Sequence, residues 1–400
     1  MSESLPQALH AHAAALLAQV LRFELPADTV VQQYLKRERR LGARDRARLS
    51  DLVFGCLRHL PRLRVVAGAD ADAAALVEAW LDGGWTSLDA ATLDRASAAD
   101  MPAWLLAAWP WQDAAEAQAM AEAFNVPAPL DLRVNIAKAK RDAVQAALAR
   151  DGIETEAGRW SPHALRVMGK PALQRHPLMN DGTLEVQDEG SQLLGFLLAP
   201  RRGELVVDFC AGAGGKALHM GAMMRNAGRI HAFDVSAGRL SALSLRARRA
   251  GLSIVHPMAI TDERDTRLGR LAGKADRVLV DAPCSGLGTL RRAPDLKWRQ
   301  GPEDVHARAA VQSAILESAA RLVKPGGVLV YATCSMLAEE NEQVVDRFVA
   351  AHEAFRLEPC RPVLEKQGVA LPADERDALH LDPLHHDTDA FYGVRLVRAA

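Results

Sequence analysis

The sequence lacks the cysteine pairs that disulfide frameworks and cysteine-built zinc sites require. Its five cysteines are an odd number and include no Cys-x-x-Cys pair, which argues against both kinds of site and for a reducing compartment. It also lacks an uninterrupted apolar stretch of the roughly 18–20 residues that a membrane span needs. The segment Met1–Pro6 has no basic start followed by an apolar core, so no signal peptide is expected. We therefore expect a cytoplasmic protein without a membrane partner.

An excess of charge of either sign is also absent. Lys and Arg total 49 and Asp and Glu total 50, giving a net charge of −1. No global basicity indicates a nucleic-acid partner, so any such partner has to be recognised by local patches. Internal repeats and low-complexity linkers are missing too, and 49% of the 400 residues are hydrophobic. This length and composition indicate a globular chain of two or three compact units.

Residues 1–125 are rich in Ala, Leu and Arg at helical spacing, which predicts a small helical domain. Its best-defined part holds a basic stretch between residues 36 and 48. Arg37, Arg40 and Arg44 are candidates there to bind phosphates, and each contact would add to a salt-dependent affinity. A solvated helix face with internal ion pairs is an equally good interpretation.

Residues 126–200 change character and predict a small α+β module, with a strand near 129–135 and a helix near 142–150. Residues 201–400 form the third expected domain, in which strand and helix patterns alternate. The expected strands are 204–209, 229–233, 253–257, 277–280 and 328–332, and the expected helices are 216–225, 237–250, 303–322 and 338–351. Such alternation predicts a parallel sheet with right-handed crossovers, an α/β fold.

A glycine-rich loop, Asp-Phe-Cys-Ala-Gly-Ala-Gly-Gly-Lys at 208–216, follows the first of these strands. Glycines let the backbone approach a ligand closely, and the next helix presents free N–H groups. The loop also satisfies the G-x-G-x-x-A pattern of dinucleotide binders, so a dehydrogenase is a rival interpretation. Asp234, at the end of the second strand, would contact ribose hydroxyls in either case. The loop alone does not choose between a nicotinamide cofactor and S-adenosylmethionine.

Two cysteines follow strand-like runs at equivalent places, Cys284 after Val278–Asp281 and Cys334 after Val328–Ala332. The carboxyl ends of parallel strands line the ligand crevice, so both thiols are expected in one pocket if these strands are neighbours. A thiolate that adds to carbon 6 of cytosine, with an acid protonating nitrogen 3, makes carbon 5 nucleophilic enough to accept a methyl group. Asp281, Cys284 and Cys334 supply the groups that this chemistry requires. The other three cysteines are interpreted as small buried hydrophobic residues.

Several motifs together resemble the Sun/RsmB-type RNA cytosine-5 methyltransferases, in particular their bacterial ribosomal RNA branch. The motifs are the loop 208–216, Asp-Ala-Pro-Cys-Ser-Gly-Leu-Gly at 281–288, Arg-Arg-Ala-Pro-Asp-Leu-Lys-Trp at 291–298, Ala-Thr-Cys-Ser at 332–335, Val-Gln-Asp-Glu-Gly-Ser at 186–191 and Thr-Asp-Ala-Phe-Tyr at 388–392. The resemblance covers about residues 130–397. It implies a Rossmann-type class I methyltransferase domain with a mainly parallel sheet, preceded by an RRM-like α+β module. The N-terminal helices are similar, more weakly, to NusB-like RNA-binding domains.

The same resemblance implies a role for individual residues. Cys334 is expected to be the nucleophile and Cys284 to promote product release; spacing does not make that assignment, because DNA cytosine methylases attack with the proline-cysteine motif. Asp281 is expected near both the methionine end of the cofactor and the target base, and Lys216 to contribute charge. The S-adenosylmethionine-binding residues are expected to be Cys210, Ala211, Gly212, Ala213, Gly214, Gly215, Lys216, Asp234, Asp262 and Asp281.

At 212–217 the loop reads Gly-Ala-Gly-Gly-Lys-Ala where the family commonly has Ala-Pro-Gly-Gly-Lys-Thr, so that Ala213 replaces the proline and Ala217 replaces the threonine. Loss of the proline should loosen the free loop. Loss of the threonine removes a hydroxyl near the start of the helix. We expect weaker cofactor binding at most, with activity retained.

Basic residues after the catalytic motif, Arg291, Arg292 and Lys297, are candidates to hold the RNA backbone beside a flipped base. Trp298 either joins them or anchors the loop in the core. His380, His385, His386 and Asp387 suggest metal ligands, but the reaction needs no metal and a histidine-rich surface loop is the better interpretation.

The sequence thus predicts a monomeric S-adenosylmethionine-dependent methyltransferase that modifies carbon 5 of a cytosine in RNA, with small-subunit ribosomal RNA as the expected substrate. Transfer RNA is the alternative substrate. A catalytically silent RNA-binding assembly factor is the alternative outside the enzyme class.

Overall fold

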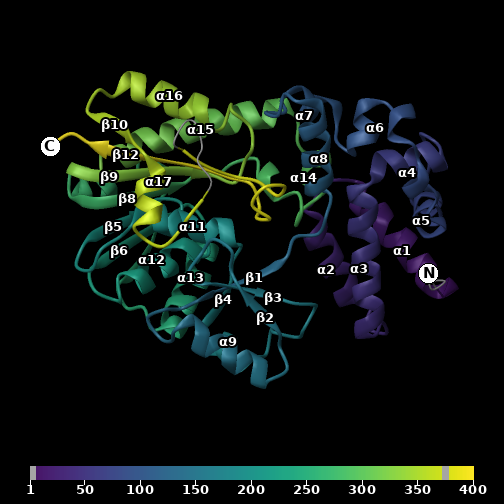
Figure 1. The fold of residues 1–400 in the computed structure, drawn as a ribbon, viewed down its shortest axis with the longest axis horizontal. Helices are drawn as coiled ribbons and strands as arrows, with labels where there is room; N and C mark the ends of the chain where they lie inside the picture. The colour runs from purple at the N-terminus through teal and green to yellow at the C-terminus, as the bar shows by residue number, and fades with distance from the viewer. Residues whose placement is uncertain (1–5, 372–377) are drawn as a thin grey trace. The chain divides into compact units, whose positions relative to one another are not determined.

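The computed structural model describes residues 6–371 and 378–400 of the chain. The chain forms two compact units (Figure 1). One unit consists of Met1–Pro127 together with Ser285–Val305, and the other of Ala128–Cys284 together with His306–Ala400. The chain therefore leaves the second unit directly after Cys284 and re-enters it at His306.

Helices make up the regular structure of the first unit. They are α1 (Gln7–Val20), α2 (Ala27–Arg37), α3 (Ala43–Arg58), α4 (Leu60–Ala67), α5 (Ala73–Asp82), η1 (Gly84–Ser87), η2 (Ala90–Thr92), α6 (Arg95–Ala99), α7 (Ala103–Ala107), α8 (Ala114–Phe124), η4 (Leu287–Thr289) and α14 (Leu296–Arg299). In α3 the residues Leu49, Leu52, Val53 and Cys56 are buried at helical spacing, so one face of this helix enters the core. A Cβ on Gly55 would lie 2.4 Å from the Trp80 ring, so this close approach of α3 and α5 requires glycine.

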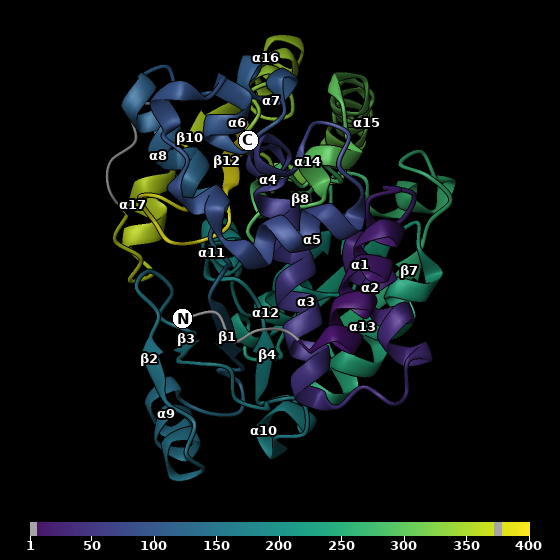
Figure 2. The same ribbon diagram turned by 90° about the vertical axis from the view of Figure 1, so that its right-hand side faces the viewer.

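The second unit contains a small antiparallel sheet of four strands in the order β2-β3-β1-β4. These strands are β1 (Leu130–Val134), β2 (Thr155–Ala157), β3 (Ala164–Val167) and β4 (Leu184–Val186). Helix α9 (Arg141–Arg150) packs against β2 and β3, with Val144 and Leu148 in the apolar cluster that it shares with β3. Figure 2 shows α9 next to β2, and the short helix α10 (Pro177–Asn180) precedes β4.

The large sheet of this unit has the order β10-β12-β9-β8-β5-β6-β7, and β11 pairs with β12. Its strands are β5 (Leu205–Asp208), β6 (Arg229–Asp234), β7 (Val255–Ala259), β8 (Ala275–Asp281), β9 (Val323–Thr333), β10 (Phe355–Glu358), β11 (Leu379–Leu381) and β12 (Phe391–Arg398). Strands β5 to β9 pair in parallel, and β10, β11 and β12 join in antiparallel orientation. The chain order reverses between the neighbours β5 and β8, and ligands bind outside the carboxyl ends of strands at such a switch point.

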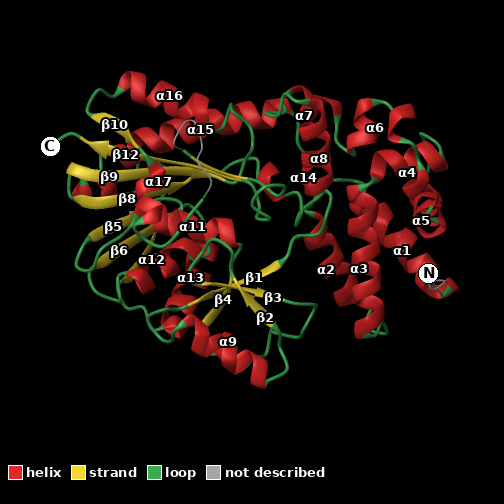
Figure 3. Cartoon of the chain, viewed as in Figure 1, coloured by secondary structure: helices red, strands yellow, loops and turns green. Residues whose placement is uncertain are grey.

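Helices cover both faces of the large sheet (Figure 3). They are α11 (Glu189–Leu198), α12 (Gly215–Met223), α13 (Ala237–Ala250) and α17 (Cys360–Glu365) on one face, and η3 (Thr266–Leu271), α15 (Pro302–Ala320) and α16 (Glu342–Ala351) on the other. Because both faces are covered, the central strands are apolar throughout; Val278, Leu279 and Val280 of β8 are all fully buried.

The structure confirms the predicted α/β fold with a mainly parallel sheet, the preceding α+β module and the helical N-terminal region. Helix α13 has the predicted bounds, whereas β9 begins five residues earlier than expected, at Val323. The sequence assigned residues 285–305 to the catalytic domain, but in the structure they belong to the helical unit. No helix in the described part of the chain combines the length and the apolar character needed to cross a bilayer.

Candidate active site

Three carboxylates end neighbouring strands at the switch point of the large sheet. Asp208 ends β5, Asp234 ends β6 and Asp281 ends β8. The parallel register sets Asp208 beside Leu279 of β8 and beside Ala232 of β6, so the three strand ends meet at one edge. This edge is where the sequence predicted a cofactor and a target base.

Both cysteines of the predicted pair lie at this edge. Cys284 follows β8 and Cys334 follows β9, and Asp281 is paired with Ala332 in the parallel register of these strands. The Sγ atoms of Cys284 and Cys334 are 3.2 Å apart, and both residues are partly exposed. The structure therefore brings together the two thiols that the sequence placed fifty residues apart.

Lys216 forms the charged centre of the site. Its Nζ donates a hydrogen bond of 2.6 Å to Asp281 Oδ2, and it lies 5.7 Å from the centre of the Phe391 ring. Burial alone would lower the pKa of Lys216, but the charges of Asp281, Cys334 and Asp208 raise it above its ordinary value. Lys216 therefore stays protonated and supplies positive charge beside both Asp281 and Cys334.

Asp208 belongs to the site, although no role was predicted for it from the sequence. Its side chain is fully buried, and among the described residues its carboxylate oxygens have no side-chain hydrogen-bond partner. The backbone N–H of Ala217 approaches the carboxylate and opposes the rise in its pKa. Burial, followed by the negative charges of Asp281 and Asp234, raises the pKa of Asp208 to about 7. The same burial and the same carboxylates raise the pKa of the Cys210 thiol, which makes Cys210 an unreactive cysteine.

The glycine-rich loop is held at its backbone by side chains of the same unit. Asp234 Oδ2 accepts a hydrogen bond of 2.8 Å from the N–H of Gly212, and Arg246 Nη1 donates one of 2.6 Å to the carbonyl of Ala213. Arg133, from the small sheet, donates to the carbonyl of Gly215. Gly214 adopts φ +90°, and a Cβ there would lie 2.4 Å from Leu243, so this position requires glycine. Asp262 lies after β7 and is exposed, with its Oδ1 accepting the N–H of Arg264.

The predicted RNA-binding arginines of the helical unit are on its surface. Arg37, Arg40 and Arg44 are exposed, and Arg37 donates to the side chain of Gln19. Arg46 of the same basic stretch instead donates to the carbonyls of Leu35, Glu38 and Leu41 and so stabilises the end of α2.

Two of the other three basic candidates are buried. Lys297 is 1% exposed and donates to the carbonyls of Arg58 and Asp100 and to the side chain of Asn125. Arg291 is 5% exposed, whereas Arg292 is exposed. Burial lowers the pKa of Lys297 to about 7. This burial argues against the RNA contacts that the sequence suggested for Lys297 and Arg291, because both side chains are withdrawn from the surface and the ammonium group of Lys297 is bonded to three acceptors of the helical unit.

The histidine-rich segment is bound into the fold by hydrogen bonds. His380 pairs with Glu342 at 3.0 Å, and His385 and Asp382 form a pair at 3.0 Å. Among residues 6–371 and 378–400, no group of three or more His, Cys, Asp or Glu side chains is arranged to hold a metal ion.

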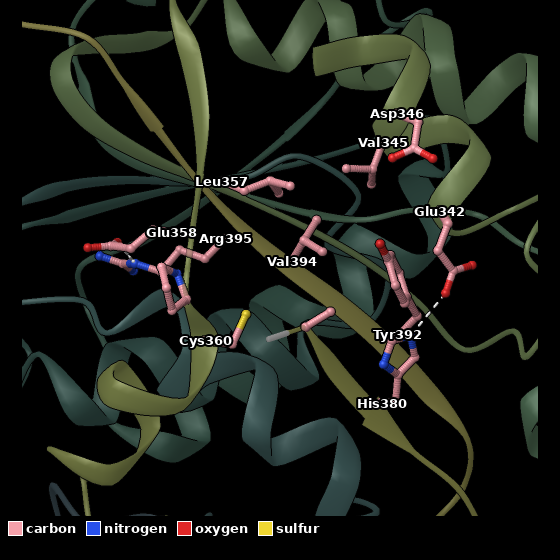
Figure 4. Close-up of a pocket in the computed structure, with 12 residues that line it drawn as sticks. Glu342, Val345, Asp346, Leu357, Glu358, Cys360, His380, Tyr392, Val394 and Arg395 are labelled. Carbon is pink, nitrogen blue, oxygen red and sulfur yellow. Dashed lines mark hydrogen bonds and ion pairs between the residues drawn. The ribbon is translucent and has the colours of Figure 1, made fainter. Parts of the chain in front are cut away.

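A cavity of about 270 Å³ lies in the second unit between α16, β10 and β12. Figure 4 shows Glu342, Asp346 and Glu358 around it, with His380 and Tyr392 at one end. These carboxylates oppose the binding of a phosphate backbone. The cavity is therefore not a candidate site for nucleic acid.

Comparisons with known proteins give a consistent result. Residues 195–397 match the family model described as 16S rRNA methyltransferase RsmB/F, and residues 101–174 match a ferredoxin-like domain of RsmF/B-like methyltransferases. The "probable ribosomal RNA small subunit methyltransferase B" of Synechocystis is 36% identical over 71% of this chain and 64% of its own length. The protein of that name from Bacillus subtilis is 35% identical over 67% of this chain and 59% of its own length.

A solved structure extends the similarity to almost the whole chain. The crystal structure of PH0851 matches 99% of this chain and 100% of its own with a TM-score of 0.80 and 25% sequence identity. The chain nevertheless spans only about three fifths of the length of the two curated relatives. Because the matching family model covers half of the sequence, the chain belongs to the 16S rRNA methyltransferase RsmB/F family.

Proposed function

We propose that this protein is an S-adenosylmethionine-dependent methyltransferase that modifies carbon 5 of a cytosine in small-subunit ribosomal RNA. The names of its relatives support the substrate. The observation that carries the proposed chemistry is the pair of thiols, 3.2 Å apart, beside the Lys216–Asp281 ion pair at the switch point of the sheet. A methylase of exocyclic amines has no use for such a pair.

The charges at the strand ends fit S-adenosylmethionine. Asp208, Asp234 and Asp281 are close enough for the charges of the other two to raise the pKa of Asp208, and Lys216 is the cation beside them. This surplus of negative charge favours a cationic sulfonium ligand. When bound, the cofactor supplies an electrophilic methyl group. Gly212, Gly214 and Gly215 would hold its methionine part through the backbone, Asp234 would face its ribose, and Asp262 its adenine.

The chain's own residues prepare the base. In the proposed reaction the Cys334 thiolate forms a bond to carbon 6 as the ring's 5,6 double bond breaks, and nitrogen 3 takes a proton. Asp281 accepts a hydrogen bond from Lys216, so we infer that the Lys216–Asp281 pair delivers this proton. After carbon 5 has been methylated it loses its proton to water, and the double bond re-forms as the bond between carbon 6 and the sulfur of Cys334 breaks. Nitrogen 3 then returns its proton to the Lys216–Asp281 pair. Cys284 is proposed to promote this last stage, a role taken from the family resemblance.

RNA binding is proposed for the exposed arginines Arg37, Arg40 and Arg44 of the helical unit and for Arg292. Each neutralised phosphate would make affinity more dependent on salt. The cytoplasm, where bacterial ribosomal RNA is made, is the proposed location, and a monomer the proposed state.

Replacing either cysteine tests the function directly. Cys334→Ala should reduce methyl transfer to unmodified small-subunit ribosomal RNA by at least about 10³-fold, because the covalent step is lost. Cys284→Ala should instead accumulate a covalent protein–RNA complex on denaturing gels. Cys360→Ala, a buried cysteine distant from the reaction in sequence and role, is the matched control and should retain activity. Undiminished methylation by Cys334→Ala would exclude the proposed mechanism. If the wild-type protein methylated transfer RNA but not ribosomal RNA, the proposed substrate would be wrong.

A further inference from the structure

Two buried amide side chains form hydrogen bonds to the backbone next to the two thiols, one amide for each cysteine. Gln312 of α15 is fully buried and Asn341, the residue before α16, is 2% exposed. Neither has a role in the chemistry described above. Buried amides carry a desolvation cost, so their hydrogen bonds indicate what they are used for.

Gln312 holds the backbone that carries Cys284. Its Nε2 donates a hydrogen bond of 3.1 Å to the carbonyl of Pro283, the residue before the cysteine, and one of 2.9 Å to Glu340 Oε1. Its Oε1 accepts a hydrogen bond of 3.2 Å from the Tyr331 hydroxyl. The amide nitrogen that binds the Pro283 carbonyl is thus also held by Glu340, and the amide oxygen is bonded to Tyr331.

The Pro283 carbonyl sets the orientation of this amide. A carbonyl oxygen can only accept a hydrogen bond, so Gln312 must present its nitrogen to Pro283 and its oxygen to the other side. Burial raises the pKa of the Tyr331 phenol well above its ordinary value, and the charges of Cys284 and Glu340 raise it further, so the hydroxyl keeps its proton. That single proton is shared between the carbonyl of Glu340 at 2.5 Å and Gln312 Oε1 at 3.2 Å.

Asn341 forms hydrogen bonds to the residues on both sides of Cys334. Its Oδ1 accepts a hydrogen bond of 2.5 Å from the hydroxyl of Thr333, and its Nδ2 donates one of 3.0 Å to the carbonyl of Ser335. These are the residues on either side of Cys334. The Thr333 hydroxyl also accepts the N–H of Ser335 at 3.2 Å, which closes a tight turn around the cysteine.

We propose that Gln312 and Asn341 are separate positioning residues for the two thiols, Gln312 for the release step at Cys284 and Asn341 for the attack by Cys334. The proposal rests on the function proposed above. Because the proposed function gives the two cysteines different roles, the two amides would act on different stages of one reaction. Displacing a reacting atom by about 1 Å can cost up to 10²-fold in rate.

The two stages give different signatures with one probe, an unmodified transcript of bacterial small-subunit ribosomal RNA with radiolabelled S-adenosylmethionine. Gln312→Met should raise the fraction of enzyme trapped as a covalent RNA complex by about 10-fold, as release slows. Asn341→Ala, placed in the Cys284→Ala background that traps the complex, should lower its rate of formation by about 10- to 100-fold. Gln343→Met and Gln343→Ala, at an exposed amide of α16, are the matched controls and should behave like their parents.

A second pair of variants keeps the test independent of folding. Thr333→Val keeps the shape of the side chain but removes the hydroxyl that binds Asn341, and it should slow formation of the complex. Thr333→Ser retains the hydroxyl and should rescue it. Calorimetric titration with S-adenosylmethionine should give unchanged affinity for all variants, since neither amide contacts the glycine loop.

The outcomes separate the two proposals. Suppose that the wild-type protein methylates the RNA, but that the Gln312 and Asn341 variants form the covalent complex in the same amount and at the same rate as their parent proteins. The positioning roles are then wrong, and the proposed function stands. Exchanged signatures would also overturn them. If wild-type protein transfers no methyl group and Cys284→Ala traps no RNA, the proposed function fails, and the positioning roles fail with it.

Discussion

At the scale of single residues, the site contains side chains that the proposed reaction needs but whose burial lowers the stability of the fold. Asp208 is the clearest case, because a fully buried carboxyl group with no side-chain hydrogen-bond partner among the described residues is costly. Its pKa of about 7 reflects that cost. Such a group at the end of a central strand is what a site for a cationic ligand requires, and a neutral residue would serve the fold better.

Asp208→Asn should therefore stabilise the protein without cofactor, in a manner that depends on pH. An unfolded aspartate has a pKa near 3.9, so between about pH 4 and pH 7 the folded state holds a proton that the unfolded state has lost. The free energy of unfolding of the wild type falls as pH rises through this window, and asparagine lacks this fall. The melting temperature of the variant should exceed that of the wild type by several degrees at pH 8, at roughly 2–4 °C per kcal/mol, and by little at pH 4.

Calorimetric melting curves from pH 4 to pH 8 check this prediction. Asp262→Asn, at an exposed carboxylate, is the control and should show no such dependence. A constant difference between Asp208→Asn and the wild type across this range would mean that Asp208 is ionised throughout.

Burial also decides the role of Lys297. Three hydrogen bonds to acceptors inside the helical unit occupy its ammonium group. Lys297→Met should destabilise the protein by about 3 kcal/mol, because it leaves those acceptors unsatisfied. It should leave the salt dependence of RNA binding unchanged, unlike Arg40→Met, which should reduce the slope of log affinity against log salt by about 1. Urea unfolding and binding titrations at several salt concentrations measure both effects, and a lower slope for Lys297→Met would restore it as a phosphate contact.

At the scale of elements, the glycine loop shows how contacts distant in sequence compensate for a local loss. Ala213 stands where the family commonly has proline, yet Arg246 holds its carbonyl and Arg133 holds that of Gly215. These arginines come from α13 and β1, so the small antiparallel sheet takes part in shaping the cofactor loop. The expected loosening of the loop is thereby limited.

Ala213→Pro should strengthen cofactor binding modestly. Proline restricts the unbound loop and is worth about 0.4–1 kcal/mol where the backbone can accept it, which corresponds to roughly 2- to 5-fold in affinity. Ala213→Gly should weaken binding for the opposite reason. Isothermal titration with S-adenosylmethionine compares the three proteins. Weaker binding by the proline variant would mean that the arginine contacts hold the loop in a conformation that excludes proline.

At the scale of the whole molecule, local sequence patterns predicted the helices and strands well. They did not predict the contacts between residues that are distant in the sequence. Alternating apolar strands and helices specified the parallel sheet, because strands covered on both faces must be apolar. The antiparallel strands β10 and β11 were missed, since their alternation of apolar and polar residues extends over only four and three positions. Strand β12 begins within the Thr-Asp-Ala-Phe-Tyr motif, which the sequence analysis used only for the family resemblance.

The site was predictable where a motif follows a strand and unpredictable where a side chain arrives from elsewhere. Cys284 and Cys334 were paired correctly because strand ends of a parallel sheet converge. Gln312 had only a weak signal, an amide on the otherwise apolar face of a helix, and Asn341 had none. The separation of residues 285–305 into the helical unit could not be anticipated either, because Lys297 looked like a surface residue beside a catalytic motif and Trp298 was compatible with either the surface or the core.

The central claim is that Cys334 attacks the base and that Cys284 serves release. The most direct test is mass spectrometry of the covalent complex formed by Cys284→Ala with unmodified small-subunit ribosomal RNA and S-adenosylmethionine, after digestion of both partners. The account predicts one modified peptide, with a methylated cytidine nucleotide attached to Cys334. A nucleotide on any other residue, or a stable complex formed by Cys334→Ala through Cys284, would contradict it.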